Sequence, residues 1–184
     1  MFKKAILATA LICGASFGAQ AQLRVGAGLM TGMPMGDFGD SYSFGLGGGV
    51  WADYFVSDNI AVGLNIGYLN FGGSEEVEDA LEYSTSMLPI MVTGDWHFMP
   101  GETFDFYAGL GLGLNLTTTT VEVLGVEGEE SETAFQIAVP RVGVHYMFSD
   151  AFGLDFNTGF NILTINEESA NYVPLNLGVF YVFE

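Results

Sequence analysis

The stretch that decides the fold is FGLDFNTGFNI, residues 152–162. Large apolar or β-branched side chains occupy every second position from Phe152 to Ile162, and glycine, aspartate or asparagine fills the positions between them. Side chains of a β-strand point alternately to its two faces, so this pattern predicts a strand with one apolar face and one small or polar face. Similar alternation covers residues 60–71, 104–116 and 172–183.

Extended over the whole chain, the pattern predicts eight strands, at residues 22–31, 43–55, 60–71, 86–98, 104–116, 134–148, 152–162 and 172–183. Most are longer than the usual strand of about 5–6 residues, and they match the roughly 9–11 residues that a tilted strand needs to cross a bilayer. Long polar connections (32–42, 72–85, 117–133, 163–171) alternate with short turns (56–59, 99–103, 149–151). Long external loops and short periplasmic turns are typical of outer-membrane barrels.

The composition of the two strand faces indicates which one meets lipid. One face is apolar along the whole strand, and the other is rich in glycine and asparagine but poor in lysine. A face in water would carry charges of both signs, whereas the lumen of a small barrel favours small side chains. Backbone groups in lipid must all be hydrogen-bonded, and closure of the sheet achieves this. We therefore predict an all-β fold, an eight-stranded antiparallel up-and-down transmembrane β-barrel.

Aromatic residues near the short turns support this prediction, because barrels carry aromatic girdles at the membrane interface. The residues are Tyr54, Trp96, Phe98, Phe104, Tyr146, Phe148, Phe152, Tyr181 and Phe183.

The N-terminal residues have the pattern of a cleavable signal peptide. Lys3 and Lys4 precede a short apolar run, and Ala19-Gln20-Ala21 fits the small-residue cleavage rule. We expect a signal peptide at residues 1–21 and a barrel domain at residues 22–184. The only cysteine, Cys13, lies in the signal, so the mature chain has no thiol for a disulfide, a metal site or a nucleophile.

The charge of the chain narrows its partners. Its formal net charge is −18, with 22 acidic and four basic residues, of which Arg24 and Arg141 remain in the expected mature chain. Such a chain repels the phosphates of nucleic acid, so we expect no nucleic-acid partner. Disorder is also disfavoured, because 49% of the residues are hydrophobic.

The chain resembles the outer-membrane β-barrel domain family of small OmpX-like and OmpA-like barrels. The resemblance rests on Ala19-Gln20-Ala21, on the hairpin WADYFVSDN at 51–59 and on the ending LGVFYVF at 177–183. It implies a monomer in the Gram-negative cell outer membrane, in contact with lipid and lipopolysaccharide. It also implies insertion by the barrel assembly machinery, which reads a terminal aromatic residue; here Glu184 follows Phe183.

Ionisable residues on the small and polar face should form a charge network in the lower lumen: Arg24, Asp53, Asp95, His97, Asp105, Arg141, His145 and Asp155. Pairing about the turn at 149–151 would place His145 opposite Asp155, and Arg24 should share a level with Asp53. We favour a network that closes the lumen, because buried charges need partners. The alternative is a selectivity or proton-linked gate.

We predict neither enzymatic activity nor a cofactor. Acyl hydrolysis needs a nucleophile, a base and an orienting carboxylate. The only bases, His97 and His145, have no serine two residues away on the same strand face. The glycine-rich segments at 45–49 and 109–113 are not followed by a helix pattern or a lysine, which argues against nucleotide binding.

Acidic residues concentrate in the long connections, and the longest, 117–133, is the candidate interaction loop. Its acids form solvated surface, or they bind divalent cations or a cationic extracellular partner. They are Glu122, Glu127, Glu129, Glu130 and Glu132.

Three functions stay open at this point. The first is a non-enzymatic role in envelope structure or surface interaction, favoured because side chains can fill an eight-stranded barrel. The second is a narrow porin-like channel for small solutes or ions, favoured by the many lumen glycines. The third is a soluble ligand-binding barrel with apolar residues inside.

Overall fold

A computed structural model of the chain describes residues 22–73, 82–123, 126–165 and 168–183. The predicted signal peptide at 1–21 lies outside them. The strands are β1 (Leu23–Met35), β2 (Tyr42–Ser57), β3 (Ile60–Gly73), β4 (Glu82–His97), β5 (Phe104–Val123), β6 (Val126–Met147), β7 (Phe152–Ile165) and β8 (Glu168–Phe183). The helix α2 (Asp37–Ser41) separates β1 from β2. No described helix is long and apolar enough to cross a membrane.

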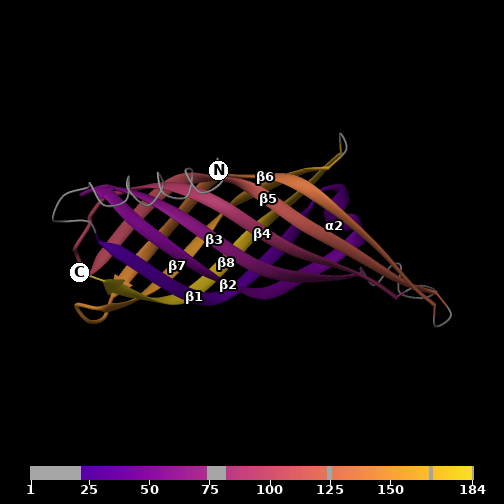
Figure 1. Ribbon diagram of the computed structural model, residues 1–184, viewed down its shortest axis with the longest axis horizontal. Helices are drawn as coiled ribbons and strands as arrows, with labels where there is room; N and C mark the ends of the chain where they lie inside the picture. Colours follow the sequence, from indigo (N-terminus) through magenta and orange to yellow (C-terminus); the bar gives the residue numbers. More distant parts are fainter. Residues whose placement is uncertain (1–21, 74–81, 124–125, 166–167, 184) are drawn as a thin grey trace, which may run out of the picture.

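The strands form a closed barrel in which each pairs with its neighbour in sequence and β8 pairs with β1 (Figure 1). All eight pairings are antiparallel. The predicted fold is therefore confirmed. Both ends of the described chain lie at the end of the barrel that carries the short turns, and α2 lies at the opposite mouth.

The predicted loop at 117–133 is wrong in one respect. β5 and β6 continue through it as a paired ladder as far as Val123 and Val126, so most of the segment is a β-hairpin. Its threonine run is β-branched and suits a strand, and Thr118 pairs with Ser131 through a 2.9 Å hydroxyl contact. The segment at 163–171 is likewise largely strand, because β7 extends to Ile165 and β8 begins at Glu168. Polar sequence does not distinguish loops from strands in this part of the chain, because a strand that extends beyond the lipid into water has no apolar face.

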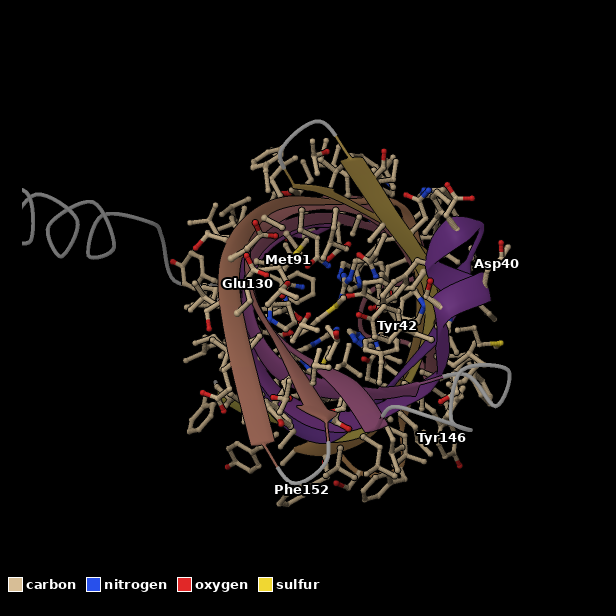
Figure 2. All side chains as sticks on the ribbon, turned by 90° about the vertical axis from the view of Figure 1, so that its right-hand side faces the viewer. Asp40, Tyr42, Met91, Glu130, Tyr146 and Phe152 are labelled. Carbon is tan, nitrogen blue, oxygen red and sulfur yellow. The ribbon has the colours of Figure 1, made fainter. Side chains whose placement is uncertain are left out.

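The faces of the strands follow the prediction. Leu29, Val92 and Leu112 point outward and are about half exposed, whereas Asp105 and Asn115 point inward and are buried. Figure 2 shows nitrogen and oxygen atoms gathered inside the ring of strands, with Tyr146 and Phe152 outside it. An outer surface of exposed apolar side chains suits lipid and not water. The soluble barrel with inverted faces is therefore excluded.

The predicted girdle residues lie outside at the short-turn end, where several rings touch one another. Phe152 packs against Tyr181 with centroids 5.0 Å apart, and Phe104 against Tyr146 at 4.9 Å. Tyr54 is half buried, and the others are exposed.

The opposite mouth contains an apolar cluster that the face pattern did not predict. Its buried members are Phe38, Leu69, Phe71, Met87, Ala134, Leu163 and Tyr172. Phe38 comes from α2 and packs on Phe71 at 5.2 Å, and Phe71 packs on Tyr172 at 5.9 Å. The chain enters α2 through Gly36, whose φ of 62° favours glycine. The short helix thus carries an aromatic side chain into the barrel mouth.

Lumen glycines make room for a large side chain. A Cβ atom on Gly26 or Gly178 would overlap the indole of Trp51. Gly178 is also close to the backbone, because its Cβ would lie 2.7 Å from the carbonyl oxygen of Ala27. These glycines therefore leave room for the indole of Trp51 inside the barrel.

Candidate functional site

The eight residues of the predicted charge network all point into the lumen near the short turns. Seven of them are buried, and the Arg141 side chain is 11% exposed. The predicted register is confirmed, since His145 pairs with Asp155 and Arg24 with Asp53. We call this group, with the aromatic residues around it, the ionic layer.

Arg24 on β1 lies at the centre of the ionic layer. Its NH1 atom is 2.7 Å from Nδ1 of His145 and 3.3 Å from a carboxylate oxygen of Asp105. The same Asp105 oxygen is 2.7 Å from Nδ1 of His97. A single cation therefore joins β1 to β5 and β6 across the lumen.

His145 has a charged side chain beside each ring nitrogen. Its Nδ1 lies 2.7 Å from NH1 of Arg24, and its Nε2 lies 3.2 Å from Asp155. Asp155 also accepts from the Tyr107 hydroxyl at 2.8 Å and from Asn157 at 2.6 Å. His145 thus links Arg24 to Asp155.

The other arginine, Arg141, pairs with Asp95. Asp53 is buried at 4% exposure, and one of its carboxylate oxygens has no hydrogen-bond partner among the described residues. It lies against Gly63, where a side chain would overlap it. The layer therefore contains two guanidinium groups and four carboxyl groups.

Aromatic rings surround the charges. The Arg24 guanidinium lies 4.4 Å from the ring centre of Phe55 and 5.6 Å from that of Phe180. Arg141 lies 5.0 Å from the Tyr107 ring. Such contacts stabilise a cation that has left water. The layer thus brings ion pairs and aromatic rings together in the lower lumen.

The sequence analysis did not identify these rings, although the alternation of side chains along each strand predicts that they point inward. Phe55 lies two residues from Asp53, and Phe180 lies two residues from Gly178, so both share the inward face. Tyr107 lies two residues from Asp105, so it shares the inward face with it, and it is buried.

The ionic layer contains one set of atoms with metal-ligating chemistry. Ligand atoms of His97, Asp105 and His145 lie within 4.8 Å of one another. The Arg24 guanidinium contacts both Asp105 and His145, so a positive charge already lies among these atoms. Arg24 therefore acts as the cation of this set. The hydrogen bonds described for the two histidines involve no serine or threonine hydroxyl, so the layer lacks the pairing that hydroxyl nucleophiles need.

Above the ionic layer the lumen contains a cavity of about 90 Å³. Trp51, Arg141 and Asp155 line it on the side of the layer, and Gln136 and Tyr172 line it on the side of the apolar cluster. The volume accommodates several water molecules.

An amide network lies on the wall of this cavity. Gln136 accepts from Asn115 at 2.8 Å and donates to Asn161 and to the Tyr172 hydroxyl, both at 3.0 Å. These hydrogen bonds link the inner faces of β5, β6, β7 and β8.

The second predicted group, the acids of segment 117–133, lies on strands and not on a loop. Glu129, Glu130 and Glu132 are exposed on β6. Glu122 and Glu127 face each other across the ladder, and their side chains lie outside the described residues. The acids thus belong to a projecting β-hairpin (Figure 1).

A closed antiparallel barrel with an apolar exterior and a charged interior defines an integral membrane β-barrel protein. The chain matches the outer membrane protein beta-barrel domain family over residues 5–183 and belongs to it. The resemblance noted in the sequence is confirmed, and the protein is located in the outer membrane. No curated protein sequence matches the chain.

Solved structures share the fold at low sequence identity. Ail, the attachment invasion locus protein of Yersinia pestis, is 13% identical with a TM-score of 0.64, covering 90% of this chain and 100% of Ail. Neisserial surface protein A is 16% identical with a TM-score of 0.59, covering 90% and 98%. OprG from Pseudomonas aeruginosa is 15% identical with a TM-score of 0.59, covering 89% and 96%. At such identities the similarity concerns the fold alone.

Proposed function

We propose that this protein is a non-enzymatic outer-membrane barrel with a closed lumen that acts at the cell surface through the β5–β6 hairpin. One observation supports the proposal: buried side chains meet inside the barrel at two separate levels. The ionic layer lies at the short-turn end, and the apolar cluster with Phe38 lies at the opposite mouth. The alternative, a narrow channel, would need both levels to open.

The hairpin supports the surface role. It projects beyond the rest of the barrel at the end opposite the short turns (Figure 1). Export through a signal peptide at 1–21 and insertion by the assembly machinery would place the short turns in the periplasm and the hairpin outside. Its exposed glutamates then face the medium, where divalent cations or a cationic partner are the expected binders.

A polysulfated ligand is not expected. One structure of Ail holds sucrose octasulfate, described as a heparin analogue. The present chain has a formal net charge of −18 and exposes Glu129 and Glu130 on its hairpin, so a polyanion would be repelled. The shared fold therefore does not extend to shared ligand chemistry.

Conductance in planar lipid bilayers tests the closed lumen. We expect the refolded mature protein to insert without unitary current steps, while a general porin in the same bilayer conducts. Stable unitary steps from the pure protein would favour the channel alternative. Incubation with phospholipid and lipopolysaccharide, followed by mass spectrometry of the acyl chains, tests the absence of hydrolysis.

A further inference from the structure

The outer face of the barrel carries a row of uncharged polar side chains on four adjacent strands. Asn70 on β3 pairs with Ser86 on β4, Ser86 pairs with Thr118 on β5, and Thr118 pairs with Ser131 on β6. The alternate positions of these strands, such as Leu69, are buried in the lumen, so the four side chains point outward. We call these four residues the polar row.

The polar row borders the apolar part of the outer face. Four residues nearer the short turns on each strand lie Ile66, Ile90, Leu114 and Phe135, which pair in register and are all exposed. Tyr68 lies between the two rows on β3 and is 49% exposed. A ring with a polar tip is typical of the boundary between lipid chains and headgroups. The polar row therefore lies where lipid headgroups begin, at the end opposite the short turns.

The polar row offers hydrogen-bond donors and acceptors side by side. Ser86 accepts from Nδ2 of Asn70 at 3.0 Å, and its hydroxyl lies 2.9 Å from that of Tyr68. The hydroxyls of Thr118 and Ser131 also lie 2.9 Å apart. A bond between two hydroxyls uses one of their two hydrogens, so each pair keeps a donor as well as acceptor lone pairs. Sugar hydroxyls have the same double character.

Charge distinguishes between headgroups. Residues 22–184 contain two arginines and two histidines and no lysine, and all four of these side chains lie in the ionic layer inside the barrel. A phosphate on the outer face would therefore meet no basic side chain. It would also approach Glu129, which pairs with Thr120, two residues from Thr118. Negative headgroups are repelled there, and an uncharged headgroup is not.

We propose that the polar row binds the uncharged sugar headgroup of a glycolipid in the outer leaflet. The sugar hydroxyls bond to the row, and the acyl chains lie along the apolar side chains next to it, which already face lipid. This inference rests on the proposed function, because it requires the hairpin end of the barrel to lie outside the cell.

The experiment measures which lipids the refolded mature barrel retains in native mass spectrometry. Three lipids with identical acyl chains are supplied in equal amounts: glucosyl diacylglycerol, phosphatidylglycerol and phosphatidylcholine. The test variant combines Ser86→Ala with Thr118→Val, which removes two hydroxyls of the row. The matched control is Thr164→Val, because Thr164 is an exposed, outward residue of β7 outside the row. These surface substitutions should leave the fold intact, which the heat-dependent shift in gel mobility checks.

We expect the unaltered barrel to retain the glucosyl lipid at least about fivefold over either phospholipid, the factor that one net hydrogen bond provides. The double substitution should bring this ratio close to one. Thr164→Val should leave the ratio unchanged.

Equal retention of the three lipids would overturn the proposal, and so would a preference that survives the double substitution. Retention of phosphatidylglycerol over the glucosyl lipid when magnesium is added would show that the surface holds phosphate through a metal ion, which would also overturn it. None of these results bears on the closed lumen, which the conductance measurement tests separately.

Discussion

Replacing Arg24 by methionine tests how far the ionic layer stabilises the barrel. The substitution removes the donor to His145 at 2.7 Å and to Asp105 at 3.3 Å, together with the cation over Phe55. Removing one partner of a buried ion pair costs about 3–5 kcal/mol. Asp105 keeps a second donor, since His97 lies 2.7 Å away, and methionine keeps apolar contact with Phe55. We therefore expect the free energy of unfolding to fall by about 3 kcal/mol, the lower end of that range.

Urea unfolding of the refolded barrel in lipid vesicles, followed by tryptophan fluorescence, measures this change. Adding Asp105→Asn to Arg24→Met removes the carboxylate left without its arginine, and the amide oxygen of the new side chain can still accept from His97. The double variant should recover roughly 1–2 kcal/mol of the loss. A loss below about 0.5 kcal/mol for Arg24→Met, the size of an ordinary surface substitution, would refute the stabilising role of the layer. So would a double variant no more stable than the single one.

Three further substitutions, and one control substitution, test other parts of the barrel by the same unfolding measurement. Gly178→Ala should lower the free energy of unfolding by about 1–3 kcal/mol, because the added methyl group displaces Trp51. In the control Gly94→Ala the new Cβ meets nothing within 4 Å, so the free energy should change by less than about 0.5 kcal/mol. Equal effects of the two substitutions would contradict the packing of Trp51 against Gly178. Leu112→Arg should cost about 2–4 kcal/mol if its side chain faces lipid, and no loss would contradict that orientation. Phe38→Ala should cost about 3 kcal/mol; an unchanged stability would show that α2 does not close the mouth.

The strands and their register were predictable because their signals are local. Alternation has the period of the strand itself, and a short turn fixes how two strands pair. The turn at 149–151 alone places His145 opposite Asp155, and the structure confirms that pairing. The burial of Asp105 follows from the same parity.

Contacts across the lumen were not predictable, because they depend on the width and tilt of the whole barrel. Arg24 meets His145 from a strand 121 residues away in sequence. The alternation of side chains places Arg24 and His145 inside the barrel, but it does not predict which carboxylate or imidazole the guanidinium contacts. The apolar cluster was missed for a related reason. Leu69 and Phe71 share the inward face with glycines, and only their packing against Phe38 and Tyr172 from other elements explains why apolar residues are buried there.

The hairpin was taken for a loop because its strands lack an apolar face. Outside the bilayer a strand loses the lipid that makes one face apolar, so polarity no longer separates strand from loop. The β-branched residues Thr117 to Thr120 were the remaining signal, and β-propensity is a weak guide on an exposed surface.

The barrel and the β5–β6 hairpin are joined by continuous ladders. β5 and β6 pair from Phe104 and Tyr146 beside the short turns to Val123 and Val126 at the tip. An isolated two-stranded hairpin is marginally stable in water. Its base, however, belongs to the barrel, and β4 pairs with β5 as far as Glu82 and Glu122. The barrel and β4 therefore hold the hairpin in extended form before any partner arrives, which lowers the entropy that binding must overcome.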